Sequence, residues 1–140
     1  MKKKMIIIGG GISGIYLSIL LKKYLDIDVV VLEANDKPLK KLLATGNGRC
    51  NLSNKDLDKA HYDGDIKPWV NDIIHDFDIV EALKDIGLYT KYMGNLLYPY
   101  SESAKAVQTL FLNRAEEYGV KIICDEEVLS IKKSKHGYFI

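Results

Sequence analysis

The sequence has few arginines and no excess of either charge. Only Arg49 and Arg114 are arginines among 20 lysines and arginines, and 19 acidic residues leave a formal net charge of +1. Guanidinium is the usual bidentate reader of bases and phosphates, and a near-neutral chain has no long-range field that attracts polyanions. We therefore expect no nucleic-acid partner and no attraction to an anionic membrane. An arginine, where one does occur, deserves an explanation.

Cysteine and histidine are also scarce. Cys50 and Cys124 form no CxxC pair, and the three histidines show no HxxxH spacing. Disulfide frameworks and zinc sites need clusters of these residues. The composition therefore predicts no metal site and favours a reducing compartment, so we expect a cytoplasmic protein.

The chain lacks a long uninterrupted apolar run. Three lysines precede an uncharged stretch from Met5 to Leu21, which has the outline of a signal peptide or a short membrane span. Glycines interrupt this stretch, however, no A-x-A cleavage site follows it, and Lys22 and Lys23 close it. We expect neither export nor a membrane anchor.

The same residues fit a strand, a turn and a helix. Met5–Ile8 is a short apolar run, typical of a strand buried on both faces of a parallel sheet. After a glycine turn, residues 12–24 have apolar positions at helical spacing, and the β-branched run 28–33 predicts a second strand. The three elements predict a βαβ unit.

The glycines of the turn form the dinucleotide fingerprint Gly9-x-Gly11-x-x-Gly14. Gly9 permits a tight turn, Gly11 lets the backbone approach a pyrophosphate, and Gly14 allows close packing of helix and strand. The first helical residues supply N–H groups and the positive end of the helix dipole. Glu33, at the end of the second strand, can bind ribose hydroxyls and would repel a 2′-phosphate, which favours FAD or NAD over NADP.

A second glycine-rich segment, residues 40–54, reads KKLLATGNGRCNLSN. It is too polar and too rich in glycine for a regular element, so we expect a tight loop. Its small residues would let backbone amides approach a flat ring, and Arg49 offers five donors to a heterocycle or to a substrate carboxylate. The alternative is a solvent-exposed loop of two turns.

These residues resemble a bacterial flavoprotein family, the aminoacetone oxidase-like or bile-acid reductase-like NAD(P)/FAD-dependent oxidoreductases. The resemblance is carried by GGGISG, Glu33, KLLATGNGRCNLSN and the segment LYPYSESA at 97–104. One departure is Leu39, where the family commonly has glycine. The resemblance implies extended FAD, with its adenosine at Glu33, its pyrophosphate at Gly11–Gly14 and its ring system near Gly46–Asn51.

The cofactor-binding residues implied by the fingerprint and the resemblance extend over both glycine-rich segments and one later position. They are Gly9, Gly11, Ile12, Ser13, Gly14, Glu33, Ala34, Lys41, Leu42, Thr45, Gly46, Arg49, Cys50, Asn51 and Val128. For Cys50 a small buried hydrophobe is the competing interpretation. No residue is assigned a catalytic role.

The remaining elements indicate an α/β protein. Helices are expected at 68–77, 79–85 and from Ser101 or Ser103 to Tyr118, and strands at 88–92, 96–98 and 120–124. Residues 128–132 and 138–140 predict the start of an antiparallel β-meander. The fold class expected is a Rossmann-like FAD-binding domain with a three-layer parallel sheet, incomplete at the C-terminus. Residues 1–140 would be the N-terminal part of that domain, with the substrate domain absent.

Two classes of function follow. The first is an FAD-dependent oxidoreductase whose full-length parent transfers hydride between flavin and a small organic substrate or NAD(P)H. The second is a non-catalytic dinucleotide-binding fragment, since the 140 residues alone hold no convincing acid–base pair and we expect them to be inactive. An NAD-dependent dehydrogenase also fits Glu33, but it leaves the loop at 45–51 without a purpose. The oligomeric state is not predicted.

Overall fold

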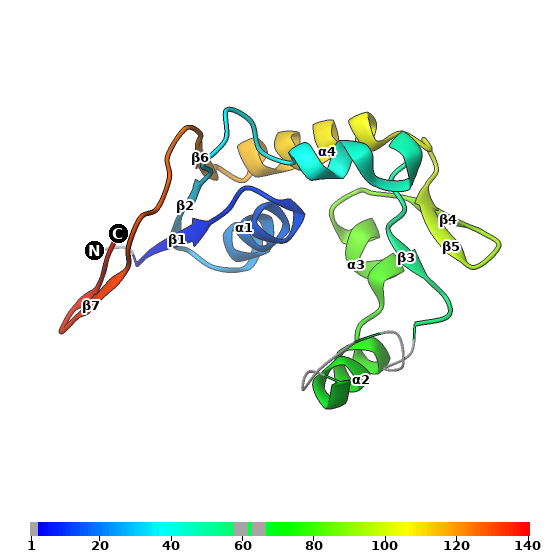
Figure 1. Ribbon diagram of the computed structural model, residues 1–140, viewed down its shortest axis with the longest axis horizontal. Helices are drawn as coiled ribbons and strands as arrows, with labels where there is room; N and C mark the ends of the chain where they lie inside the picture. The colour runs from blue at the N-terminus through cyan, green and yellow to red at the C-terminus, as the bar shows by residue number, and fades with distance from the viewer. Residues whose placement is uncertain (1–2, 58–61, 63–66) are drawn as a thin grey trace. The chain divides into compact units, whose positions relative to one another are not determined.

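The computed structural model describes residues 3–57, 62 and 67–140 of the chain (Figure 1). Its contacts divide the chain into two compact units. The first unit comprises residues 1–43 and 111–140, and the second comprises residues 44–110. The chain passes from one unit to the other inside two helices, η1 (Lys40–Gly48) and α4 (Ala104–Glu117).

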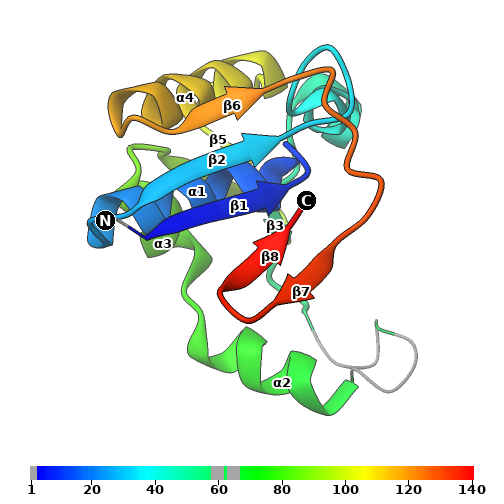
Figure 2. The same ribbon diagram turned by 90° about the vertical axis from the view of Figure 1, so that its left-hand side faces the viewer.

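The first unit contains the predicted parallel sheet. Strands β1 (Lys4–Ile8), β2 (Asp28–Leu32) and β6 (Lys121–Ile123) lie in the order β1-β2-β6, and their arrows run in the same direction in Figure 2. The register places Ile7 opposite Val31 and Val31 opposite Ile122. Helix α1 (Ile12–Tyr24) connects β1 to β2 and packs against both. The predicted βαβ unit is therefore confirmed.

Helix α1 begins and ends at the residues that its sequence pattern predicts. Ile15 and Ile19, four residues apart, are fully buried because residues at this spacing share one face of a helix. Ser18 is buried on the same side, and its hydroxyl donates to the carbonyl of Ile15 at 2.6 Å. Lys22 and Lys23 occupy the last turn, where positive charge is favourable.

Helix α4 has the start and stop signals expected of it. The hydroxyl of Ser103 accepts a hydrogen bond from the amide of Ala106 at 3.2 Å, which satisfies one of the donors at the helix start. At the other end Gly119 has a φ of +72°, and Val120 donates back to the carbonyl of Ala115 at 2.8 Å. Phe111 is buried and meets Tyr16 of α1 edge to face, with ring centroids 6.1 Å apart.

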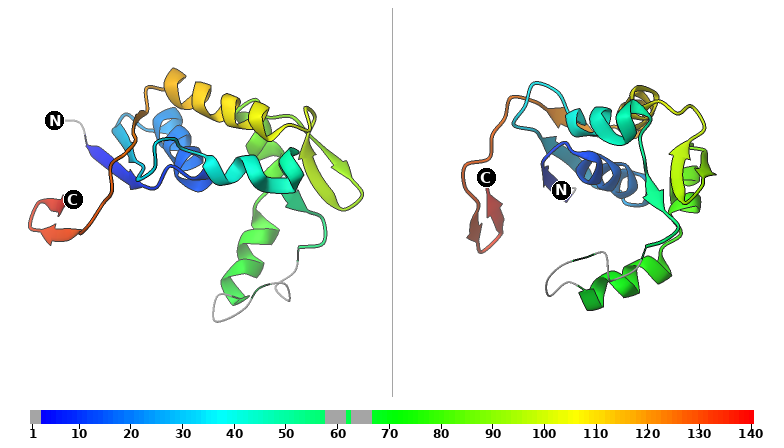
Figure 3. Two further views of the ribbon diagram at one scale, coloured as in Figure 1. Left: turned by 45° about the horizontal axis from the view of Figure 1, so that its top comes forward. Right: turned by 45° about the vertical axis from the view of Figure 1, so that its right-hand side comes forward.

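The second unit is built on an antiparallel sheet of β3 (Ser53–Asn54), β4 (Thr90–Met93) and β5 (Leu96–Pro99). Their order is β3-β5-β4, and β4 and β5 form a hairpin that both views of Figure 3 show in yellow-green. Gly94 has a φ of +61° at its turn, a conformation that glycine adopts without a steric penalty. Leu97 and Tyr98 of β5 are buried, as are Leu83 and Leu88.

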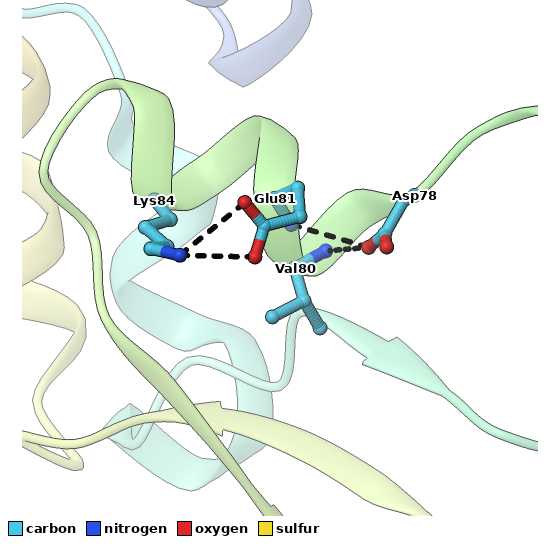
Figure 4. Close-up of polar contacts among 4 residues, drawn as sticks. All are labelled: Asp78, Val80, Glu81 and Lys84. Carbon is cyan, nitrogen blue, oxygen red and sulfur yellow. Dashed lines mark hydrogen bonds and ion pairs between the residues drawn. The ribbon is translucent and has the colours of Figure 1, made fainter.

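Two helices, α2 (Lys67–Asp76) and α3 (Ile79–Asp85), precede this hairpin. Figure 4 shows how α3 starts: the carboxylate of Asp78 accepts from the amides of Val80 and Glu81 at 2.9 and 3.1 Å. Lys84 pairs with Glu81 one turn later, at 3.1 Å. The cap replaces hydrogen bonds that the first amides of a helix cannot make within the helix.

The structure corrects several details of the sequence interpretation. Residues 40–54 are more than a loop, because they contain η1 and β3. Met5 and Ile8 of β1 are 43% and 48% exposed, so that strand is not buried on both faces within the described chain. The last hairpin is formed by β7 (Lys132–Ser134) and β8 (Gly137–Phe139), both short, and Val128 lies outside any strand. Strand bounds shift because they depend on pairing rather than on local pattern.

Among the residues described, none of the helices combines the length and the apolar character needed to cross a bilayer.

The Asp78 cap yields a stability prediction. Replacing Asp78 by Ala removes the acceptor of two amide hydrogen bonds and should cost about 1 kcal/mol of unfolding free energy. Asp56 is an exposed aspartate that does not cap a helix, and it serves as the control. D56A should change the unfolding free energy by less than about 0.5 kcal/mol. Urea unfolding followed by circular dichroism measures both, and equal effects of the two variants would contradict the assigned cap.

Candidate functional site

Two of the three fingerprint glycines are required by the fold itself. Gly9 has a φ of +98°, and its amide donates to the carbonyl of Leu32 at 2.8 Å, which joins the turn to the end of β2. A Cβ on Gly14 would lie 2.1 Å from the carbonyl oxygen of Gly9. Gly14 therefore lets α1 start directly against the turn, as its place in the motif predicts.

Gly11 has no such reason to be glycine. Its φ of −70° and ψ of 176° suit any residue, and a Cβ there would have no described atom within 4 Å. Gly11 is also the N-cap of α1, where no side chain caps the helix and no acidic residue lies in the first turn. Ile12 and Ser13 follow it and are exposed. The open amides of this turn suit a phosphate that approaches the backbone closely.

Glu33 is buried, and its carboxylate is held by three donors of the chain. One oxygen accepts from the amide of Gly10 at 2.7 Å, and the other accepts from the amide and the side-chain amide of Asn35 at 2.9 and 2.5 Å. A carboxylate offers about four lone-pair positions. Glu33 therefore retains room for a ribose hydroxyl while it also fixes the glycine turn.

Sequence reasoning missed the two residues that position this carboxylate. Asn35 supplies two of the three donors, and Gly10 supplies the third. A Cβ on Gly10 would lie 3.0 Å from side-chain atoms of both Glu33 and Pro38, so a larger residue there would press on the carboxylate. The signals were present in the sequence, as a third adjacent glycine and as an asparagine two positions after the acid, but neither is part of the fingerprint pattern.

Leu39 reveals why a glycine is common at its position in the family that the sequence resembles. The amide of Leu39 donates to the carbonyl of Gly10 at 2.8 Å, and Leu39 adopts a φ of +60°. That conformation is costly for a branched side chain. Leu39 is only 2% exposed, so burial of its side chain offsets part of the cost.

The hydrogen bonds to Glu33 lower the pKa of its carboxyl group. The amide and side chain of Asn35 are the main cause, followed by the amide of Gly10 and the charge of Lys40, while burial acts in the opposite direction. A carboxyl group with a lowered pKa in the folded state stabilises the fold above its unfolded pKa of about 4.3, and that contribution is lost as the pH falls through the folded pKa.

We therefore predict a pH-dependent effect of Glu33→Gln. At pH 7 the variant should lose about 1 to 3 kcal/mol of unfolding free energy, because an amide cannot accept all three hydrogen bonds. The difference from the unsubstituted chain should shrink below about pH 4, as its carboxyl group becomes protonated. Urea unfolding at a series of pH values measures this, and a difference that stays constant down to pH 3 would contradict the role of the charge.

The glycine-rich loop at 45–51 contains a left-handed turn. Gly46, Asn47 and Gly48 have consecutive positive φ values of 55°, 54° and 80°. Glycine and asparagine are the residues that tolerate this conformation best, which explains the order Gly-Asn-Gly. The turn is closed by hydrogen bonds from the amides of Arg49 and Cys50 to the carbonyls of Gly46 and Thr45, at 3.1 and 3.0 Å.

Tyr98 of β5 anchors this loop. A Cβ on Gly46 would lie 2.6 Å from the amide nitrogen of Asn51 and 3.2 Å from the ring of Tyr98, so the loop backbone packs directly on that ring. The guanidinium of Arg49 lies 5.1 Å from the centroid of the same ring, in a cation–π contact. Sequence reasoning had no means to pair Arg49 with Tyr98, since the residues are far apart in the chain.

Cys50 is fully buried within the second unit and has a φ of +64°. Burial raises the pKa of its thiol, and a hydrogen bond with Thr45 acts in the opposite direction. A protonated, inaccessible thiol is a poor nucleophile and a poor redox partner. The structure therefore favours Cys50 as a packing residue over direct flavin chemistry.

The burial of Cys50 leads to a reactivity prediction. Cys124 is partly exposed, although its pKa is also raised by burial and nearby acids. At pH 8 iodoacetamide should therefore alkylate Cys124 much faster than Cys50, and unfolding in urea should abolish the difference. Peptide mass spectrometry over time reports both rates, and comparable native rates would show that Cys50 is accessible.

The other predicted site residues fall into both units. Ala34 and Lys41 are exposed and Leu42 is buried in the first unit, while Val128 is half-buried there. Asn51 is exposed in the second unit. Among the described residues no group of three His, Cys, Asp or Glu side chains could hold a metal ion. His61 lies outside the described residues.

The family described as the HI0933-like protein Rossmann domain matches residues 3–140. The 3-dehydro-bile acid delta(4,6)-reductase of Clostridium scindens is 37% identical in an alignment of 138 positions that covers 96% of this chain and 34% of that protein. The ribosomal RNA dihydrouridine synthase of Haemophilus influenzae is 29% identical in an alignment of 133 positions that covers 91% of this chain and 32% of that protein.

This chain therefore spans about a third of the length of these curated relatives. Among solved structures, THI4 of Thermovibrio ammonificans has a similar fold, with a TM-score of 0.61 at 16% sequence identity. The similarity covers 98% of this chain and 44% of THI4. The predicted Rossmann-like fold is thereby confirmed.

Proposed function

The chain belongs to the HI0933-like family of Rossmann domains, and from this we propose that it is the FAD-binding part of an oxidoreductase. The observation that carries the proposal is the presence of glycine at position 11. The described chain gives no conformational or packing reason for glycine there, whereas a pyrophosphate against the backbone does. On this proposal residues 1–140 belong to an FAD-binding domain.

The residues of the first unit would hold FAD by its dinucleotide part. The open amides at the start of α1 would bind the pyrophosphate, and the remaining acceptor position of Glu33 would bind a ribose hydroxyl. When bound, FAD supplies hydride exchange with an organic substrate or with NAD(P)H. The chain's own task is placement and electrostatics: Gly10 and Asn35 fix the carboxylate of Glu33 before any ligand arrives.

The names of the relatives suggest the class of reaction. One relative is named for the reduction of double bonds in a dehydro-bile acid, and the other for the formation of dihydrouridine in ribosomal RNA. Both names describe the addition of hydrogen across a carbon–carbon double bond. We extend this to the present chain: the full-length enzyme would reduce such a bond in an organic substrate, with NAD(P)H as the source of electrons.

A small-molecule substrate fits this chain better than RNA. Its net charge is +1 and it has only two arginines, of which Arg114 pairs with Glu117 at 2.5 Å. RNA-binding surfaces usually carry an excess of positive charge. A non-catalytic binding module remains the alternative for the 140 residues alone, and turnover of NAD(P)H with a dye as acceptor would tell the two apart.

Gly11 and Gly14 provide a matched pair of tests. Gly11→Ala places a methyl group in open space, so the unfolding free energy should change by less than about 1 kcal/mol. FAD affinity should nevertheless fall at least about tenfold, because the methyl group blocks the approach of the pyrophosphate. Gly14→Ala should lower the stability as well, since its Cβ would lie 2.1 Å from a carbonyl oxygen.

The measurement is a titration of the purified chain with FAD, followed by removal of free ligand and an absorption spectrum of the protein fraction. Urea unfolding of the same samples separates binding from folding. Retention of FAD by G11A at the affinity of the unsubstituted chain would overturn the assignment of the pyrophosphate site. An unsubstituted chain that retains no FAD would overturn cofactor binding by these 140 residues.

A further inference from the structure

One face of the sheet in the second unit gathers a second set of charged and aromatic side chains. Lys91 of β4 lies opposite Tyr98 of β5, so the two share a face. Tyr89 and Tyr100 continue that face two residues away on each strand, and the amide of Tyr100 donates to the carbonyl of Tyr89 at 3.0 Å. Arg49, above the ring of Tyr98, adds a guanidinium to the same face.

Arg49 is held in place but its charge is not paired. Its guanidinium lies over the ring of Tyr98, and the left-handed turn that precedes it is closed by two backbone hydrogen bonds. Among the described residues no carboxylate lies within ion-pairing distance of it. Arg114, the other arginine, does pair, with Glu117. A stacked guanidinium with free donors is pre-organised for a planar, bidentate anion.

The acid that could neutralise Arg49 is engaged elsewhere. Glu102 lies near enough for the charge of Arg49 to contribute to the lowering of its pKa, but the main cause is its hydrogen bond with Lys91. The Nζ atom of Lys91 lies 2.5 Å from a carboxylate oxygen of Glu102, and each of the two side chains is about two-thirds shielded from solvent. The Lys91–Glu102 pair is neutral as a unit. The face is therefore left with a single positive charge, at Arg49.

The surroundings of this charge are aromatic and accessible. Tyr89 and Tyr100 are 63% and 65% exposed, and Met93, on the same face, is 39% exposed. Exposed rings of this kind offer contact area to the apolar body of a ligand at little cost in side-chain entropy. The face thus combines one free guanidinium with several apolar contacts.

We propose that this face, formed by Arg49, Tyr89, Lys91, Tyr98, Tyr100 and Glu102, binds the carboxylate of an apolar monocarboxylic acid. The single unpaired charge matches a monoanion, and the fork of a guanidinium matches the planar carboxylate group. Phosphate esters, with a higher charge, would need a second free cation, and Lys91 is already taken by Glu102.

Binding of the acid does not depend on the proposed function, because the site lies entirely within the second unit. A role of this acid as the substrate of the oxidoreductase would rest on the proposed function. The proposed role also separates Arg49 from the cofactor. The resemblance places Arg49 among the flavin-contacting residues, whereas the face described here uses it to read a ligand carboxylate. Its substitution should then weaken binding of the acid and leave FAD affinity unchanged.

The test titrates the intact chain with 4-phenylbutyrate and follows backbone amide shifts by NMR. Its amide, 4-phenylbutanamide, has the same apolar body without the charge, and phenyl phosphate replaces the carboxylate by a dianion. We expect the acid to bind about tenfold or more tightly than the amide, with shifts at residues 46–51 and 89–102. Phenyl phosphate should bind no more tightly than the acid.

Three variants test whether the guanidinium of Arg49 binds the carboxylate of the acid. Arg49→Gln should weaken binding of 4-phenylbutyrate about tenfold or more, and Arg49→Lys should restore only part of it because a lysine has no fork. Arg114→Gln, which removes the same charge from the other arginine, should leave the affinity unchanged. Circular dichroism and urea unfolding verify that each variant remains folded.

Several results would overturn the proposal: no binding of the acid, equal binding of acid and amide, equal loss in R49Q and R114Q, or tighter binding of phenyl phosphate. A loss of FAD affinity in R49Q without any effect on binding of the acid would identify Arg49 as a cofactor-binding residue and would also overturn the proposal. FAD titrations of the same samples keep the two ideas apart. Binding of the acid through Arg49 in a chain that retains no FAD would support the carboxylate site while overturning the flavin assignment.

Discussion

The carboxylate of Glu33 is the group on which the geometry of the first unit depends. A buried carboxylate is tolerated only when donors satisfy it, and here the amides of Gly10 and Asn35 do so. The same hydrogen bonds tie the end of β2 to the turn that follows β1. One buried side chain therefore fixes the glycine turn, and its carboxylate accepts three hydrogen bonds of about four that it could accept. Its removal would disturb both the fold and the site.

Among the glycines that the structure describes, several are required by the fold, whereas Gly11 is not. Gly9 and Gly46 adopt backbone conformations that other residues rarely take, and Gly14 and Gly46 have no room for a Cβ. Gly11 has an ordinary conformation and open space around it. Neither the conformation nor the packing of the described chain requires a glycine at that position. This contrast is more informative than the motif itself, because glycine turns between a strand and a helix are common.

Arg49 is one of only two arginines in the sequence. Lysine supplies nearly all the positive charge of this chain, so an arginine in a conformationally restricted loop points to a need for a planar fork of donors. The structure places this fork over Tyr98 and pairs Glu102 with Lys91. Neither feature can be read from the sequence, since both depend on the pairing of β4 with β5 and on the packing of the loop against β5.

The sequence by itself determined the βαβ unit and the bounds of α1 and α3. These features are local: helical periodicity, glycine turns and short apolar runs act within a few residues. The tertiary structure decided those features that depend on contacts between residues far apart in the chain. Residues 132–134, rather than 128–132, form a strand because a strand needs a partner, and β1 remains partly exposed because burial depends on what covers it. Tertiary packing alone also brought Gly10 to Glu33, and Tyr98 to Arg49.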